Sequence, residues 1–173
     1  PNPEAEILRA LQRLASTFGV PRASLTLRTA SGHVRCALAG DTERPGWHTE
    51  PAPPPTSPVG LMLAGEGVLR LSDVHIEPSH FASAHPMYQG FGFFFGLPVA
   101  GTDGAPVGAL ALHAPVGHTL SAADGELFKR LTRELTPPIL RLATPPAADD
   151  ANPTPTTRAW SPLGDADNTA LAT

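Results

Sequence analysis

The stretch GFFFGLPVAGTDGAPVGALALH, residues 92–113, decides the fold. Two apolar runs flank the tetrapeptide GTDG, and an Asp-Gly pair between such runs is a strong signal for a tight hairpin turn. Residues 92–100 and 106–113 are therefore predicted to form a central antiparallel hairpin.

The first residues predict a helix that precedes the hairpin in the chain. Asn2 and Pro3 suit the N-cap and first helical position, and apolar residues then recur at helical spacing as far as Phe18. Gly19 and Pro21 are expected to end this helix.

A second helix is predicted after the hairpin. Ser121 and Asp124 resemble a capping box, and an apolar stripe follows over residues 127–135. Pro137 and Pro138 are expected to kink or end the helix, because each proline removes a backbone donor. Residues 139–142 then resume it for about a turn.

The segment between the first helix and the hairpin predicts two further strands and a loop. Residues 23–29 and 33–38 alternate apolar with polar side chains, with Ser-Gly between them as a turn. Residues 40–58 hold six prolines and are expected to form an extended loop. The rest is predicted as a short helix (59–63), a short strand (68–72) and an irregular segment across the sheet (73–90).

The composition limits the expected binding partners and the expected cellular compartment. A net charge of -4 and a pI near 5.9 provide no basic field for nucleic acid or for an anionic membrane surface. The single cysteine, Cys36, cannot form an internal disulfide, and no signal-peptide pattern or long apolar run is visible, so a cytoplasmic location is expected. The chain divides into a domain over residues 1–143 and a Pro/Ala/Thr-rich linker or disordered tail over residues 144–173.

The order of these elements resembles the GAF domain. The motifs that carry the resemblance are LRLSDV (69–74), Phe81, His85-Pro86, GLPV (96–99), DG (103–104), VGAL (107–110) and LSAAD (120–124). The resemblance implies an α+β fold related to profilin and PAS domains. A central antiparallel sheet would carry the terminal helices on one face and a ligand pocket on the other.

The resemblance also implies a class of function. GAF-like domains use the pocket for cyclic nucleotides, tetrapyrroles, haem or small metabolites, and some serve only to dimerise. This sequence has no cysteine in residues 73–90 for a bilin and no Asn-Lys-Phe-Asp-Glu signature of the cyclic-nucleotide members. The sequence therefore leaves the ligand and any cofactor unassigned.

The candidate ligand-binding residues come from the crossing segment and from the hairpin. Aromatic and histidine side chains suit a small-molecule pocket, which is apolar with a few polar groups. The predicted set is Phe81, His85, Tyr88, Phe93, Phe95 and His113. Side chains alternate along a strand, so Phe93 and Phe95 should share one face and Phe94 the other. The alternative is that Phe81 and Tyr88 simply plug the sheet.

Other groupings favour structural roles. His75, His80 and His85 are five residues apart, which fits neither one helix face nor a zinc pattern, so no metal site is predicted. Cys36 is expected to be buried and inert. No catalytic motif is present, and the sulfoxide-reducing relatives would need paired cysteines, so the chain is not expected to be an enzyme.

The sequence thus predicts a cytoplasmic sensory domain that binds a small organic ligand and signals through its terminal helices to a fused or partner output domain. The alternative is a ligand-free dimerisation module of a larger signalling protein. A homodimer through the first and last helices is expected, because apolar stripes on Leu8, Leu11, Leu131 and Leu135 can pair across a two-fold axis.

Overall fold

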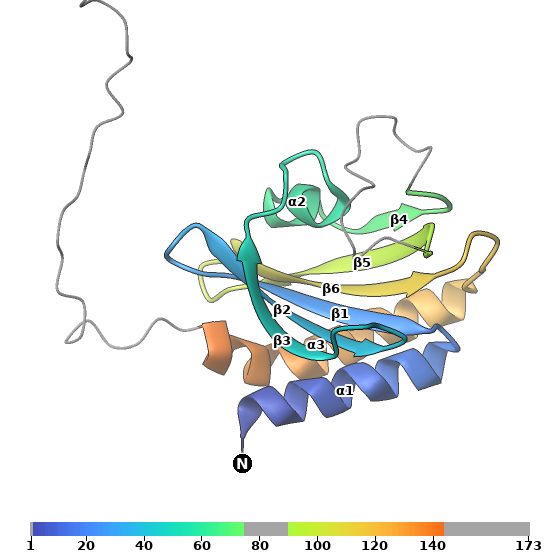
Figure 1. Cartoon of the computed structure of the whole chain (residues 1–173), viewed down its shortest axis with the longest axis horizontal. Coiled ribbons are helices and arrows are strands. Elements are labelled where there is room, and N and C mark those ends of the chain that lie inside the picture. Colours follow the sequence, from blue (N-terminus) through green and yellow to red (C-terminus); the bar gives the residue numbers. More distant parts are fainter. Residues whose placement is uncertain (1, 75–89, 144–173) are drawn as a thin grey trace, which may run out of the picture.

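The structure is a computed structural model of the chain, and it describes residues 2–74 and 90–143. Figure 1 shows a twisted sheet with two long helices below it and one short helix above it. The elements follow in the order α1 (Pro3–Phe18), β1 (Arg22–Arg28), β2 (His33–Gly40), β3 (Gly46–Pro51), α2 (Pro58–Leu63), β4 (Leu69–Leu71), β5 (Phe93–Ala100), β6 (Pro106–Ala114) and α3 (Ala122–Ala143).

The six strands form one antiparallel sheet in the order β3-β2-β1-β6-β5-β4. The predicted central hairpin is confirmed as β5 and β6, in which Phe94 lies opposite His113. Its turn is closed by the Gly101 N–H, which donates to the Ala105 carbonyl at 2.8 Å. The first hairpin, β1 and β2, joins it through pairing of β1 with β6.

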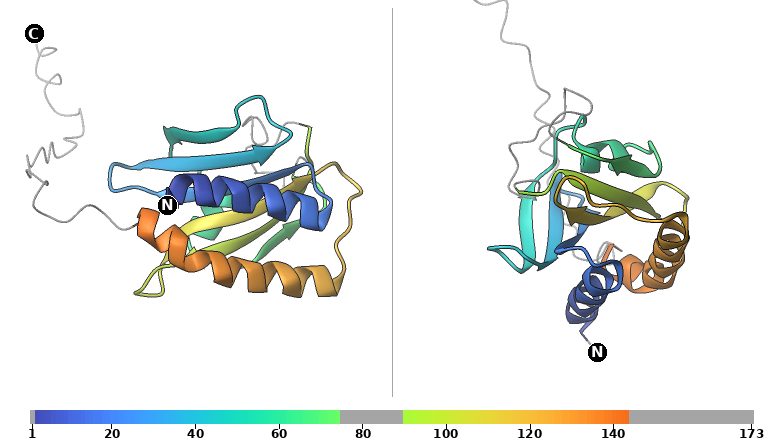
Figure 2. Two further views of the ribbon diagram at one scale, coloured as in Figure 1. Left: turned by 90° about the horizontal axis from the view of Figure 1, so that it is seen from below. Right: turned by 90° about the vertical axis from the view of Figure 1, so that its right-hand side faces the viewer.

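The α1 helix begins and ends where its sequence signals predict. The Asn2 side chain accepts a hydrogen bond from the Glu4 N–H at 3.0 Å, and Pro3 occupies the first turn. Gly19 ends the helix with φ 61°, a left-handed conformation that glycine adopts without strain. Both long helices pack on the same face of the sheet (Figure 2).

The α3 helix begins with the predicted capping box. The Asp124 N–H donates to the Ser121 hydroxyl at 3.1 Å, and the Ser121 N–H donates to the Asp124 carboxylate at 2.9 Å. These reciprocal bonds satisfy donors that the first helical turn leaves open.

The two prolines of α3 do not end it, because the helix continues to Ala143. They remove the backbone donors for the carbonyls of Arg133 and Glu134, and both residues are exposed to water. Beyond them, Ile139 is fully buried and holds the last turns against the core. Burial therefore outweighs the local preference of proline.

The loop predicted over residues 40–58 is partly wrong, because residues 46–51 form the edge strand β3. Trp47 explains the difference, since its ring packs against the main core and its Nε1–H donates to the Glu4 carbonyl at 3.2 Å. Arg35 lies over the same ring at 4.8 Å and forms an ion pair with Glu4. A long-range contact thus fixes a segment whose composition favours a loop.

Each face of the sheet carries its own hydrophobic cluster. We call the face that α1 and α3 cover the helix face, and the opposite face, on which α2 packs, the α2 face. The helix-face cluster includes Leu11, Leu25, Leu110, Leu112 and Phe128. The α2-face cluster includes Val34, Val59, Met62, Phe94 and Ala111.

Candidate ligand site on the α2 face

The α2 face of the two central strands carries small or polar side chains. Ser24 and Thr26 lie on β1, and Ala109, Ala111 and His113 lie on β6. Each is at most 1% exposed. Buried polar side chains need hydrogen-bond partners. Because the α2 face concentrates such side chains here, this patch is the candidate ligand site.

Ser24 and His113 form the centre of the patch. The Ser24 Oγ and the His113 Nε2 lie 2.8 Å apart, although the two residues are separated by 89 positions in the chain. The β1–β6 register sets this contact, because Arg22 is the direct partner of His113 and Ser24 is its diagonal neighbour. The Phe94 ring packs edge-on against the imidazole, with ring centres 5.4 Å apart.

The imidazole of His113 is neutral in the folded protein. Burial and, to a smaller extent, the positive charge of Arg22 lower its pKa to about 3. Burial also lowers the pKa of Arg22, against a smaller opposing effect of Asp41. The Arg22 Nε donates to the Asp41 carbonyl at 2.7 Å, and its guanidinium lies 4.4 Å from the centre of the Phe91 ring.

A second polar row continues from β1 to the sheet edge. The Thr26 Oγ1 lies 3.6 Å from the Cys36 Sγ, and the Cys36 Sγ lies 3.9 Å from the Glu50 Oε2. Burial raises the pKa of the Cys36 thiol to about 11, with Thr26 lowering it and Glu50 raising it. The prediction of a buried cysteine is therefore confirmed, and its thiol stays protonated at neutral pH.

Hydrocarbon covers much of the α2 face, where α2 packs on β6 and β5. The α2 helix is capped by the Ser57 hydroxyl, which accepts from the Gly60 N–H at 3.1 Å. A Cβ on Gly96 would lie 2.5 Å from the Met62 sulfur, so a larger residue here would displace the Met62 side chain where α2 approaches β5. The buried polar side chains on β1, β6 and the β2–β3 edge therefore lie next to this apolar cluster.

The structure does not bring the predicted hairpin residues together. Phe93 and Phe95 lie on the helix face, where Phe95 contacts Phe128 at 5.4 Å between ring centres. His113 lies on the opposite face with Phe94, because cross-strand partners share a face. The alternation predicted for the three phenylalanines is confirmed, but the predicted set combined residues of both faces.

The remaining predicted residues, Phe81, His85 and Tyr88, lie outside the described residues, as do His75 and His80. Within residues 2–74 and 90–143, no group of three His, Cys, Asp or Glu side chains could hold a metal ion.

Ser24, Thr26 and Phe94 are the site residues that sequence reasoning missed. A signal for the first two exists in the strand RASLTLR, where polar residues at 22, 24, 26 and 28 alternate with apolar ones. That pattern assigns the polar set to one face. It does not reveal that both faces are buried.

The fold and the two-sided burial define a small α+β domain with one apolar face and one face that combines apolar with buried polar side chains. A GAF domain model matches residues 2–136, and the chain belongs to the GAF domain family. GAF domains are sensory and regulatory modules of signalling proteins, and one similar solved structure is a segment of a methyl-accepting chemotaxis protein.

Solved structures support the same fold. The GAF domain of an Acinetobacter phosphoenolpyruvate-protein phosphotransferase is 18% identical with a TM-score of 0.68, covering 85% of this chain and 88% of that one. The type II free methionine-R-sulfoxide reductase of Thermoplasma acidophilum is 13% identical with a TM-score of 0.65, covering 80% and 93%. The GAF-B domain of DevS from Mycobacterium smegmatis is 15% identical with a TM-score of 0.60, covering 82% and 95%.

At these identities the solved structures establish the fold alone. No curated protein matches the sequence significantly. In the part of the chain that the structure describes, neither long helix combines the length and apolar character that crossing a bilayer requires.

Proposed function

We propose that this GAF domain is a sensory module whose α2 face binds a small organic ligand. The supporting observation is the difference between the two faces of β6. Its helix face carries Leu110 and Leu112, whereas its α2 face carries Ala109, Ala111 and His113. Small side chains let α2 approach β6 closely, and a few polar groups among apolar ones are typical of ligand sites.

The proposed ligand is one that hydrogen-bonds to neutral groups. The Ser24 hydroxyl and the neutral His113 imidazole both combine donor and acceptor capacity. Phe94 adds an aromatic surface beside them. Phe81, His85 and Tyr88, outside the described residues, remain predicted contacts from the crossing segment.

A reductase function is less well supported than binding. Two similar solved structures are free methionine-R-sulfoxide reductases, one of them in complex with its substrate. The present chain has a single cysteine, so no disulfide can form within it during a catalytic cycle. Cys36 also has a raised pKa of about 11, which disfavours the nucleophilic thiolate.

The dimerisation module remains the second candidate. Leu8, Leu131 and Leu135 are partly buried and pack against the chain's own core, so much of their apolar surface is already used. The proposal keeps a homodimer through α1 and α3, a fused or partner output domain and a cytoplasmic location as predictions. Sedimentation equilibrium at micromolar concentration distinguishes a dimer from a monomer.

Two substitutions on β6 test the ligand site. Ala111→Leu places bulk on the α2 face, and Ala114→Leu, the matched control, places the same bulk in the helix-face core. Overpacking a filled core costs about 1–3 kcal/mol, whereas filling an open site costs less. We expect Ala111→Leu to reduce the free energy of unfolding less than Ala114→Leu and to prevent binding of the small molecule.

Native mass spectrometry of protein purified from its own host provides the readout. The expected result is a noncovalent adduct on the unmodified protein that is absent from Ala111→Leu and retained by any folded Ala114→Leu. Equal destabilisation by both substitutions, with no adduct on the unmodified protein, contradicts the ligand site and favours the dimerisation module.

A further inference from the structure

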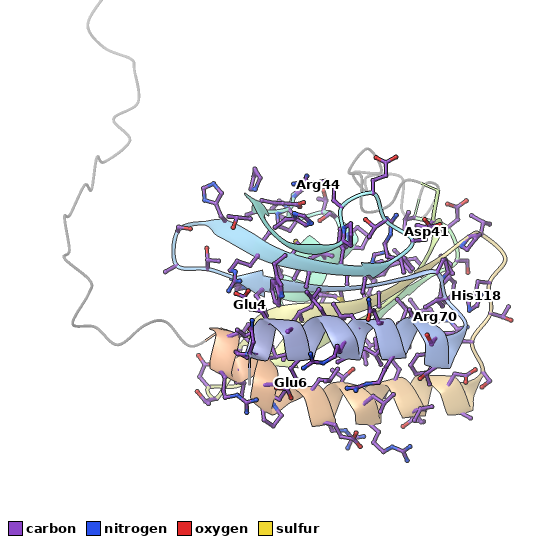
Figure 3. The ribbon with its side chains drawn as sticks, turned by 60° about the horizontal axis from the view of Figure 1, so that its bottom comes forward. Glu4, Glu6, Asp41, Arg44, Arg70 and His118 are labelled. Carbon is purple, nitrogen blue, oxygen red and sulfur yellow. The ribbon has the colours of Figure 1, made fainter. Side chains whose placement is uncertain are left out.

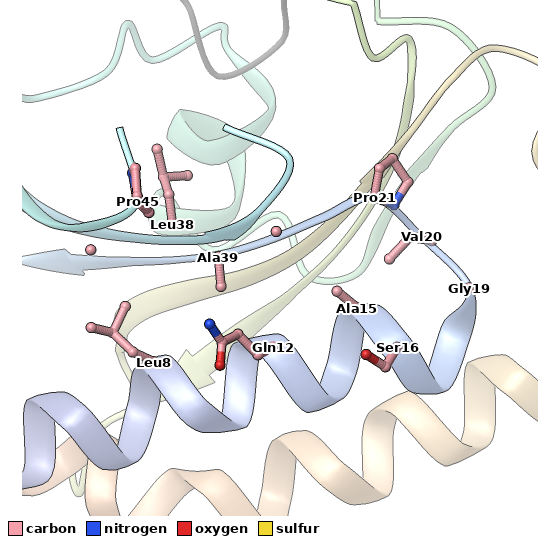
Figure 4. A pocket seen from close by; sticks show the side chains of 12 residues that line it. Leu8, Gln12, Ala15, Ser16, Gly19, Val20, Pro21, Leu38, Ala39 and Pro45 are labelled. Carbon is pink, nitrogen blue, oxygen red and sulfur yellow. The ribbon is translucent and has the colours of Figure 1, made fainter. Parts of the chain in front are cut away.

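An open hollow lies on the helix face of the sheet, between α1 and the end of β2. Its volume is about 850 Å³, and it is lined by residues that include Leu8, Gln12, Ser16, Val20, Ala39 and Pro45 (Figure 4). We call it the α1–β2 groove. None of its lining residues belongs to the α2-face cluster or to the polar patch.

Close contacts between neighbouring elements shape the groove. A Cβ on Gly40 would lie 2.1 Å from the Pro21 carbonyl oxygen, so this glycine lets the end of β2 close tightly on the start of β1. The Asp41 N–H bonds the same carbonyl at 2.7 Å. At the opposite end, Trp47 and Glu4 bring β3 onto the first turn of α1.

These contacts bound the groove at both ends. Along α1 it runs from Leu8 to Gly19, a rise of about 17 Å at 1.5 Å per residue. In Figure 3 the turn between β2 and β3, which carries Asp41 and Arg44, lies above α1. A hollow of this length and volume suits a small molecule better than an added helix or strand.

The lining carries no charged side chain. A neighbouring depression of α1 shares Gln12 and Ser16 with the groove and is also lined by Arg9, Arg13 and Thr17, but neither arginine lines the groove itself. A charged ligand would lose water without gaining an ion pair here, which costs free energy. The lining therefore favours a neutral ligand.

Two neutral polar groups of α1 face the groove. Gln12 and Ser16 are four residues apart, so they lie on one side of the helix. Figure 4 shows the Gln12 amide in the space between α1 and the strand that bears Ala39. Within the described residues, neither the Gln12 amide nor the Ser16 hydroxyl makes a side-chain hydrogen bond to protein.

We propose that the α1–β2 groove is a binding site for a neutral, mainly apolar small molecule that carries one amide or hydroxyl group. The apolar part would contact Leu8, Val20 and Ala39. The polar group would bond the Gln12 amide and the Ser16 hydroxyl, each of which both donates and accepts. This site is independent of the one proposed on the α2 face.

Three probes of the same shape and different charge test the proposal. Benzamide is neutral, benzoate is negative and benzamidine is positive. We expect benzamide to shift the backbone amide signals of Gln12, Ser16 and Gly40 in ¹H–¹⁵N NMR spectra, saturating with a Kd on the order of 1 mM, as suits a fragment of this size. Benzoate and benzamidine should bind at least about ten-fold more weakly.

Variants of α1 separate the polar contacts from the helix surface. Gln12→Ala combined with Ser16→Ala should weaken benzamide binding about five-fold or more, which corresponds to loss of about one hydrogen bond. Thr17→Ala, an exposed change on the same helix outside the groove, is the matched control and should leave binding unchanged. Gln12→Trp should obstruct the groove beside Ser16 and weaken binding by removing the amide.

Four outcomes overturn the proposal. The first is that benzamide causes no saturable shift of the groove amide signals, and the second is that all three probes shift these signals equally. The third is that shifts occur only at Ser24 and His113 on the α2 face. The fourth is that the groove signals broaden with increasing protein concentration in the absence of a probe. The last outcome would mean that a second copy of the chain covers the groove.

Discussion

The two faces of the sheet use the same strands for different purposes. On β1, Leu25 and Leu27 point to the helix face, whereas Ser24 and Thr26 point to the α2 face. All four are buried, so the difference lies in chemistry and volume rather than in exposure. The helix face gains stability from large side chains, and the α2 face keeps small and polar groups at a cost in burial.

The comparison predicts its largest effect at the centre of the helix face. Phe128 is fully buried and contacts Phe18 and Phe95 with ring centres 5.5 Å and 5.4 Å apart. Phe128→Ala should reduce the free energy of unfolding by about 3–5 kcal/mol, measured by urea denaturation. Arg130→Ala, an exposed change on the same helix, should stay within about 0.5 kcal/mol. A loss below about 1 kcal/mol for Phe128→Ala would contradict the structural role of this face.

The α2 face predicts a dependence of stability on pH. The pKa of His113 is about 3 in the folded protein, against about 6.5 when unfolded, so the unfolded chain binds the extra proton as the pH falls. Stability from this group is complete above pH 6.5 and is lost below it. Between pH 6.5 and 5 the free energy of unfolding should fall by about 1.5 kcal/mol.

Substitution of His113 isolates this effect. His113→Gln should remove most of the pH dependence in that window, whatever its effect on absolute stability, and His33→Gln, an exposed histidine, should retain it. Urea unfolding at four pH values measures the slope. Equal slopes for the original protein and His113→Gln would mean that the imidazole is not held neutral by burial.

The smallest effect is expected from removal of residues 144–173. Residues 144–173 hold few large apolar side chains, mainly Trp160 and Leu163, and ordering them would cost about 1–2 kcal/mol of backbone entropy per residue. A chain that ends at Ala143 should therefore melt within about 2 °C of the full chain by calorimetry. A decrease of more than about 5 °C would show that this segment stabilises the domain, with Trp160 as the anchor to test next.

Local signals in the sequence were sufficient for much of the fold. The Asp-Gly turn predicted the β5–β6 hairpin, Asn2 and Gly19 predicted the ends of α1, and Ser121 with Asp124 predicted the start of α3. Each of these signals acts within about four residues, through backbone geometry and capping bonds that a short segment forms by itself. The motifs placed in this order also carried the resemblance to GAF domains.

Where the structure depends on distant partners, local sequence signals predicted it less well. The composition of residues 46–51 favours a loop, but the contact of Trp47 with α1 holds them in a strand. The prolines of α3 favour a helix end, but burial of Ile139 stabilises the turns beyond them. In both cases tertiary packing supplies more free energy than the local preference removes.

The candidate site shows the same division. Alternation along residues 93–95 determined that Phe93 and Phe95 share a face, and alternation along β1 set Ser24 and Thr26 apart from the leucines. Only the tertiary structure decided which of these faces receives α1 and α3, and that His113 meets Ser24 across 89 positions. Side-chain alternation is a property of a single strand, whereas register and face assignment depend on pairing between strands that are far apart in the chain.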